Sequence, residues 1–294
     1  MTDRAKGLVA ITASAFGFAL MAACVRLSDD FGAAVSSFQK SFFRNVVALF
    51  IALVVFVRLR LAHRRDGGPP VRPRLAVKSL LLLFLRSALG TCGIFANFYA
   101  LGFVPIADGQ MLNKTAPFFT VAFAWLFLGE RASARQIGAL AIAFAGTIFV
   151  AKPGFAGALA FPLAMALLGG VCAGGAYACV RSLRRHEVEP AFIVVFFSAF
   201  SCLAAVPFMV ARFDPMTLAQ VVILFGAGAG GALGQFGITL AYGYAAPRDI
   251  AVYDYSNILF TAAFGLLLFG QIPDVWSVFG FALIVVAAVR LNHA

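Results

Sequence analysis

The hydrophobic pattern along the chain consists of long apolar runs separated by short segments rich in charged residues, glycine or proline. A helix needs roughly 20 apolar residues to cross a hydrocarbon core of about 30 Å. The runs predict ten membrane-spanning helices, at residues 7–28, 34–57, 78–103, 106–128, 134–151, 158–181, 190–211, 216–244, 248–270 and 274–292. The predicted fold class is therefore all-α, a polytopic membrane protein.

The amount of apolar surface excludes a soluble globular fold. Hydrophobic residues make up 62% of the 294 positions and charged residues 12%, whereas soluble domains contain about 25% charged residues. The first apolar run, from Gly7 to Leu27, follows Arg4 and Lys6 and resembles a signal peptide in its position. It is too long for the hydrophobic region of a signal peptide and has no clear small-residue cleavage site, so we expect it to be retained as the first helix.

The basic residues are concentrated in short loops between the apolar runs. A net charge of +11 would favour nucleic-acid binding in a soluble protein, but this placement is typical of the orientation signals of membrane proteins. The loop from Arg58 to Lys78 is rich in arginine, while the opposite loops contain only Lys152 and Arg212. We therefore expect a multi-pass protein of the bacterial inner membrane, with both termini cytoplasmic and no nucleic-acid partner.

The two halves of the chain share a sequence pattern. Segments 23–26, 89–94 and 119–129 recur, in the same order, at 178–181, 233–238 and 260–270. An odd number of helices in each copy inverts the second copy in the membrane, and inverted repeats place a transporter's substrate site near the midplane where they meet. We therefore predict a five-helix repeat at residues 1–152 and a second, inverted repeat at residues 153–294, around a central cavity.

Four segments of the first half carry a resemblance to a known family: Phe42-Phe43-Arg44-Asn45, residues 99–107, residues 115–130 and the helix from Gly138 to Gly146. In this order and with the doubled layout, they resemble the EamA-type branch of the drug/metabolite transporter superfamily, which includes bacterial amino-acid exporters. The similarity extends over nearly the whole chain. The second half departs from the pattern, with Gly270-Gln271 where the first half has Gly129-Glu130. The resemblance implies a cavity lined by helices 1, 3, 4, 6, 8 and 9, and transport by alternating access.

Charged residues inside the predicted spans are the most informative for function, because each costs from about 2.5 kcal/mol upward to insert. Arg86 lies roughly 12 Å from the start of the third span and shares a helix face with Gly90, Gly93 and Asn97. Two roles stay open for it, a substrate or gating contact and a structural brace that donates to helix-end carbonyl groups. Arg44 lies in the second span and could attract anionic groups.

The fourth span and its counterpart, the ninth, are rich in polar residues. Lys114 and Asp254 both lie near mid-depth, so we expect them to approach each other across the repeat axis. An ion pair between them would neutralise both charges, and it would either open when substrate or a proton binds or remain a permanent salt bridge. Three prolines in or before these spans are expected hinges: Pro105, Pro117 and Pro247.

The candidate substrate-binding or gating residues are Arg44, Arg86, Asn97, Tyr99, Gln110, Asn113, Lys114, Tyr242, Tyr253, Asp254, Tyr255 and Asn257. Motifs for catalysis or cofactor binding are missing from the sequence. Gly226, Gly228 and Gly231 match the spacing of a dinucleotide-binding loop, but no strand-helix unit surrounds them. The histidines lie in predicted loops or at the terminus, and the five cysteines are scattered through apolar runs. We therefore expect no enzyme activity, no catalytic residue, no cofactor and no metal.

The leading functional hypothesis is a secondary transporter that exports amino acids or similar small zwitterionic metabolites. A gradient of substrate or of an ion would drive it, because the sequence has no Walker loop for ATP. The alternative is uptake or exchange of an anionic or adenosine-like metabolite, since Arg44, Arg86 and Lys114 outnumber Asp108 and Asp254. An intramembrane enzyme or a passive channel is the reading from another class. The expected partners are a small-molecule substrate and membrane lipid, and a monomer is compatible with the sequence.

Overall fold

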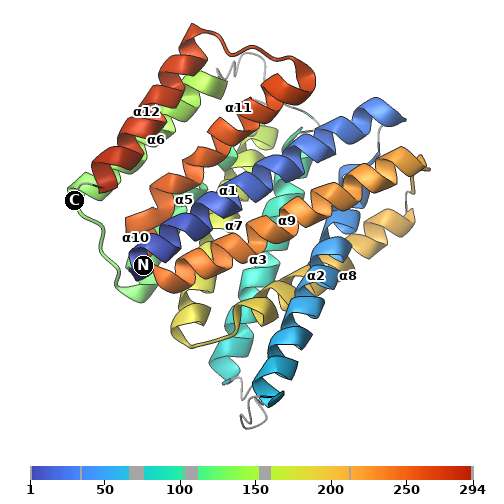
Figure 1. The fold of residues 1–294 in the computed structure, drawn as a ribbon, viewed down its shortest axis with the longest axis horizontal. Coiled ribbons are helices and arrows are strands. Elements are labelled where there is room, and N and C mark those ends of the chain that lie inside the picture. The colour runs from blue at the N-terminus through green and yellow to red at the C-terminus, as the bar shows by residue number, and fades with distance from the viewer. Residues whose placement is uncertain are drawn as a thin grey trace.

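A computed structural model describes residues 2–33, 35–65, 76–101, 103, 112–151, 160–211 and 213–292. Within these residues the chain is all-helical and contains no strand (Figure 1). The helices are α1 Asp3–Ser28, η1 Asp29–Phe31, α2 Ser37–Arg65, α3 Val77–Leu101, α5 Ala116–Leu128, α6 Ala134–Ala151, α7 Ala160–Arg185, α8 Pro190–Ala211, α9 Leu218–Tyr244, α10 Pro247–Ile250, η2 Ala251–Tyr255, α11 Ser256–Phe269 and α12 Val275–Asn292.

The helices confirm the predicted class of polytopic membrane protein. Eight helical segments in the described part of the chain are long and apolar enough to cross a membrane, and Ala116–Leu128 and Val275–Leu291 are shorter apolar helices. Two predicted spans, residues 134–151 and 190–211, coincide with α6 and α8. These agree best because proline or charged residues bound the apolar run closely.

Long helices pack in pairs that join the first half of the chain to the second. In Figure 1, α1 lies along α9, and α12 lies along α6; α3 packs on α7 and α2 packs on α8. The first and third spans thus contact the eighth and sixth, as a two-fold relation between halves would produce. The division into repeats at residues 1–152 and 153–294 stays a prediction.

Glycine residues bring the paired backbones into direct contact. A Cβ atom added at Gly17 of α1 would lie 2.6 Å from the amide nitrogen of Gly234 on α9. A Cβ atom added at Gly280 of α12 would lie 2.5 Å from the carbonyl oxygen of Gly146 on α6. In a membrane, where lipid is as apolar as the side chains, such close backbone contact is a main source of helix association.

The helices α5 and α11 end in the same way. Gly129 and Gly270 follow them with φ angles of 69° and 63°, in the left-handed region that glycine adopts without a Cβ penalty. The next amide returns to the helix in each case, from Glu130 to Ala124 at 3.2 Å and from Gln271 to the carbonyl oxygen six residues earlier at 3.0 Å. The sequence match between segments 119–129 and 260–270 therefore corresponds to a shared local structure.

The start of α1 and the end of α12 lie on one face of the bundle. The Arg4 guanidinium donates to the carbonyl oxygen of Leu291 at 2.7 Å, and we call the face that holds these two residues the terminal face. On this side α3 and α8 also begin, and α7 and α9 end. That the terminal face is cytoplasmic stays a prediction from the charge pattern.

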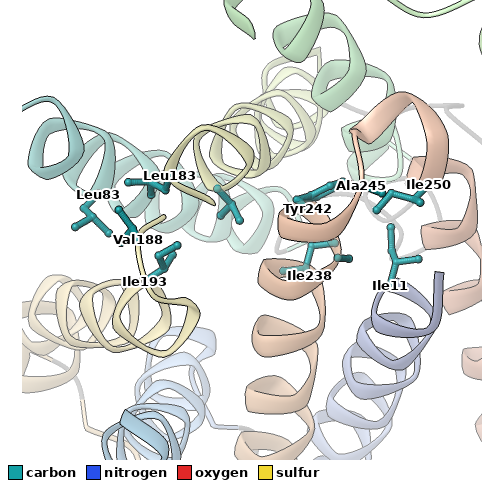
Figure 2. Packing of buried hydrophobic residues seen from close by; sticks show 11 residues of the cluster. Ile11, Leu83, Leu183, Val188, Ile193, Ile238, Tyr242, Ala245 and Ile250 are labelled. Carbon is teal, nitrogen blue, oxygen red and sulfur yellow. The ribbon is translucent and has the colours of Figure 1, made fainter. Parts of the chain in front are cut away.

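A cluster of buried apolar residues closes the bundle near the terminal face. Its members come from α1, α3, α7, α9, α10 and the start of α8. Figure 2 shows Ile11, Leu83, Leu183, Val188, Ile193, Ile238, Tyr242, Ala245 and Ile250. Because most of them are less than 2% exposed, this end of the bundle is sealed between the helices that make up the core.

Candidate functional site

Arg86 lies near the middle of α3 and is 1% exposed. Its guanidinium carbon stands 3.7 Å from the centre of the Phe197 ring on α8, and Nη2 donates to Oε1 of Gln235 on α9 at 2.7 Å. Its Nε atom has no hydrogen-bond partner within the described residues, and no carboxylate there lies within 4 Å. The side chain therefore holds a buried positive charge that only neutral groups contact.

Arg44, on α2, is a second buried cation with neutral neighbours. It is 9% exposed and donates to Oδ1 of Asn45 at 3.2 Å and to Sδ of Met21 at 3.4 Å. Asn45 in turn donates to Ser201 of α8 at 2.9 Å, which fixes the amide. Among the residues that the structure describes, Arg44 also has no carboxylate within ion-pair distance.

The two arginines contact α9 one turn apart. The Arg44 Cγ atom would lie 3.2 Å from a Cβ atom at Gly231, and Gln235, which accepts from Arg86, comes four residues later. Four residues of helix rise about 6 Å. The absence of a side chain at Gly231 leaves the space that Arg44 needs beside α9.

Lys114 is held at the break that precedes α5. Its ammonium group donates to Oδ1 of Asn257 at 2.6 Å, and the Asn257 amide donates to the carbonyl oxygen of Ala15 on α1 at 2.9 Å. The Tyr255 hydroxyl donates to the backbone oxygen of Lys114 at 2.9 Å. These bonds join the fourth span to α11 and α1 at the centre of the bundle.

The expected direct ion pair between Lys114 and Asp254 is not what the structure contains. Asp254 lies in η2 within electrostatic range of Lys114, but the described residues include no contact of 4 Å or less between the two charges. Asn257 receives the ammonium group instead. Both charged side chains remain partly accessible, so the two opposite charges are near each other and neither is neutralised by direct contact.

Tyr177 of α7 interacts with both the acidic and the basic part of this region. It lies within electrostatic range of Asp254, Arg86 and Arg44, and its ring centre is 5.8 Å from that of Tyr242. A partly buried phenol in this position can donate to an acidic group or accept from an ammonium group. Tyr177 therefore joins the candidate site.

Two predicted asparagines flank one position on α7. A Cβ atom at Gly169 would lie 3.0 Å from Nδ2 of Asn113 and 3.3 Å from Cβ of Asn97. The Oδ1 atom of Asn97 is buried without a hydrogen-bond partner in the described part of the chain. The small residue on α7 thus brings two amides from α3 and the fourth span together.

Four predicted tyrosines have other surroundings. Tyr242 is 1% exposed in the terminal-face cluster, and Tyr255 is fully buried and supports the backbone of Lys114. Tyr253 donates to the carbonyl oxygen of Ala288 on α12 at 2.9 Å, so it fastens α12 to the bundle. Tyr99 is 44% exposed and packs against aromatic rings near the end of α3, away from the charged groups.

The expected hinge prolines lie in first turns of helices where they are described. Pro117 and Pro247 occupy the starts of α5 and α10, where a proline removes no helical hydrogen bond. The fourth span is interrupted directly before Pro117, at the turn formed by Lys114 and Thr115. Pro105 and Gln110, together with Asp108, lie outside the described residues.

Sequence reasoning missed three members of the site: Tyr177, Phe197 and Gln235. Gln235 carried a weak signal, because it is the one polar side chain in the glycine-rich stretch of α9 from residue 226 to residue 237. Tyr177 comes directly before the repeated segment 178–181. Phe197 had no signal, since the chain is rich in phenylalanine and only the fold shows which ring meets Arg86.

Charged contacts close the terminal face below the site. The carboxylate of Glu130, 4% exposed, accepts from Arg181 at 2.8 Å and lies 2.5 Å from Arg185. Arg181 also donates to the carbonyl oxygen of Tyr242 at 3.0 Å, and Arg185 donates to that of Leu128 at 3.1 Å. Glu130 therefore ties the end of α5 to α7 next to the apolar cluster.

Similar proteins are membrane transporters. Residues 5–152 match the model of the EamA-like transporter family. The chain is 31% identical over 289 residues to the pseudopaline exporter CntI of Pseudomonas aeruginosa strain UCBPP-PA14, which covers 97% of the chain and 95% of that protein. It is 23% identical to the S-adenosylmethionine uptake transporter of Rickettsia bellii, over 91% of the chain and 88% of the relative. A solved structure, titled "Crystal structure of protein", shares the fold with a TM-score of 0.75 at 18% identity, covering 96% of this chain and 97% of its own.

Proposed function

Because the chain belongs to the EamA-like transporter family, we propose that it exports amino acids or similar small zwitterionic metabolites across a bacterial inner membrane. Family membership makes it a multi-pass transporter and not an enzyme. We place its substrate site between two inverted repeats, residues 1–152 and 153–294. The relatives differ in cargo and direction, so both are part of the proposal.

The observation that carries the proposal is the separation of Lys114 from Asp254. Two opposite charges lie within electrostatic range in the interior, and both keep accessible surface. A zwitterion fits such a site, because its carboxylate can bind the ammonium group of Lys114 while its own ammonium group binds Asp254. Desolvation makes each buried charge costly when it is alone, so the two ends of the ligand supply the missing partners.

Alternating access supplies the mechanism. The apolar cluster and the Glu130 contacts close the terminal face, so in this state the substrate would reach the site from the opposite face. Export then requires the terminal face to open and load substrate from the cytoplasm. A gradient of substrate or of an ion drives the cycle.

Counterflow in proteoliposomes tests the proposal. Vesicles loaded with unlabelled amino acids should accumulate the labelled form with saturable, exchange-stimulated kinetics, which a passive channel would not give. Asp254→Asn and Lys114→Met should each lower the initial rate at least tenfold. Matched controls are Asp30→Asn and Lys78→Met, since both side chains are exposed at helix ends. Full activity in both site variants, at normal thermal stability, would discard the assigned roles.

A second candidate is uptake or exchange of an anionic or adenosine-like metabolite. The observation in its favour is the pair of buried arginines that no described carboxylate neutralises. Vesicles of known orientation separate the candidates, because export and uptake differ in the side from which the site loads. Labelled amino acids, organic anions and adenosine-containing compounds should be compared in the same preparation.

A further inference from the structure

We propose that the preferred substrate carries at least two acidic groups in addition to an ammonium group, and that Arg44 and Arg86 bind the acidic groups. This inference rests on the proposed transport of zwitterions and narrows it to a chemical class, the amino-dicarboxylates and their larger relatives. It assigns an acid-binding subsite between α2, α3 and α9.

The first argument is the balance of charge. Arginine stays protonated at neutral pH, and both guanidinium groups are at least nine-tenths buried. Among the described residues, Asp254 faces three cations of the site, Arg44, Arg86 and Lys114. A neutral zwitterion brings one negative and one positive charge and leaves this excess unchanged. A ligand with additional acidic groups neutralises it.

The second argument is an unused donor. Nε of Arg86 is buried and has no hydrogen-bond partner within the described part of the chain, whereas Nη2 donates to Gln235 at 2.7 Å. A buried donor without a partner is costly, and ordinarily each is satisfied. The guanidinium fork matches the two oxygens of a carboxylate. Stacking on Phe197 holds the plane of the fork in place.

The third argument is spacing. Arg44 and Arg86 contact α9 at Gly231 and at Gln235, one helical turn or about 6 Å apart along the axis. A small molecule with two acidic groups separated by a few bonds can span such a distance. On the other side of the site, Asp254 and the free Oδ1 of Asn97 are acceptors for an ammonium group. The positions of donors and acceptors thus match the two kinds of group in the ligand.

The test compares acids with their amides in the same counterflow assay. Aspartate with asparagine, glutamate with glutamine, and 2-aminoadipate with glutarate form the panel, so that acidic and ammonium groups are removed one at a time. At least one acid should exceed its amide by tenfold in kcat/KM, and glutarate should be a poor substrate because it lacks the ammonium group. Equal transport of acids and amides would overturn the inference and leave the proposed function standing.

Variants locate the preference. Arg86→Gln and Arg44→Gln should each reduce the acid-to-amide ratio to less than threefold, and Arg86→Lys should restore only part of it, because lysine lacks the fork. Arg26→Gln is the matched control, since that side chain is 57% exposed at the end of α1. An unchanged ratio in both site variants would overturn the assignment. If a variant does not fold, the wild-type ratio still decides, and no transport of any amino compound would instead refute the proposed function.

Discussion

Replacing Glu130 by glutamine should open the terminal face. The Glu130 carboxylate is 4% exposed and joins two arginines of α7 to the end of α5. Glutamine keeps the shape of the side chain and loses the charge, so Arg181, whose side chain is 14% exposed, is left without its acid.

The size of the effect follows from the burial of the two ion pairs. Loss of one partner of a buried pair costs about 3–5 kcal/mol, while an exposed pair contributes about 0–1 kcal/mol. Arg185 is 42% exposed and belongs to the second kind, and Arg181 keeps its bond to the Tyr242 carbonyl group. We therefore expect a loss of about 2–3 kcal/mol for the closed arrangement, a shift of about 30- to 150-fold in the equilibrium.

Cys179 is a natural reporter for this change. It lies on α7, 8% exposed, behind the apolar cluster. In a variant that retains Cys179 as its sole cysteine, the rate of reaction with a hydrophilic maleimide in detergent should rise at least tenfold on Glu130→Gln. Glu187→Gln is the control, because Glu187 is an exposed acid on the same side. An unchanged labelling rate, at equal thermal stability, would refute the assignment of Glu130 as a closing contact.

Three further substitutions test the packing. Gly280→Ala places a Cβ atom 2.5 Å from the carbonyl oxygen of Gly146 and should destabilise by about 1–3 kcal/mol, seen as a lower melting temperature; Gly138→Ala, with nothing within 4 Å of its Cβ, should be neutral or stabilising, and equal effects would contradict the contact. Gly129→Ala forces a left-handed φ of 69° on a residue with a side chain and should cost about 1–2 kcal/mol in denaturant or thermal unfolding, so full stability would argue against this helix end. Tyr255→Phe removes one hydrogen bond to the backbone before α5 and should cost about 1 kcal/mol of stability and weaken substrate binding, as a thermal shift with and without substrate would measure; unchanged binding would limit Tyr255 to a structural role.

The order and approximate bounds of the helices could be predicted because they depend on local composition. An apolar run with proline or charge at each end predicts a span wherever it occurs, and α6 and α8 match their predicted residues. The 3-10 segment η2 inside the ninth span was not predicted, since residues 251–255 have no glycine or proline to signal a break. Hydropathy measures burial in lipid and does not distinguish an α-helix from a tighter one.

The candidate site was predictable in its depth and not in its pairings. Counting residues along α3 correctly placed Arg86 in the interior, but its partner Gln235 is 149 residues away in sequence. Asp254, Asn257 and Thr261 were assigned one face with an α-helical period, yet η2 turns by about 120° per residue instead of about 100°. The carboxylate therefore has a different direction from that expected, and Asn257 contacts Lys114 in its place.

The bond between Arg4 and Leu291 makes the first and last helices neighbours, and this has a consequence for engineering the order of synthesis. A short flexible linker could join the end of α12 to the start of α1 in a circular permutant opened between α6 and α7. Such a chain would be synthesised with α7 first while every helix pair in the bundle is preserved. Since the basic loops and not the order of helices set orientation, the permutant's new ends should emerge on the side of the membrane away from Arg4.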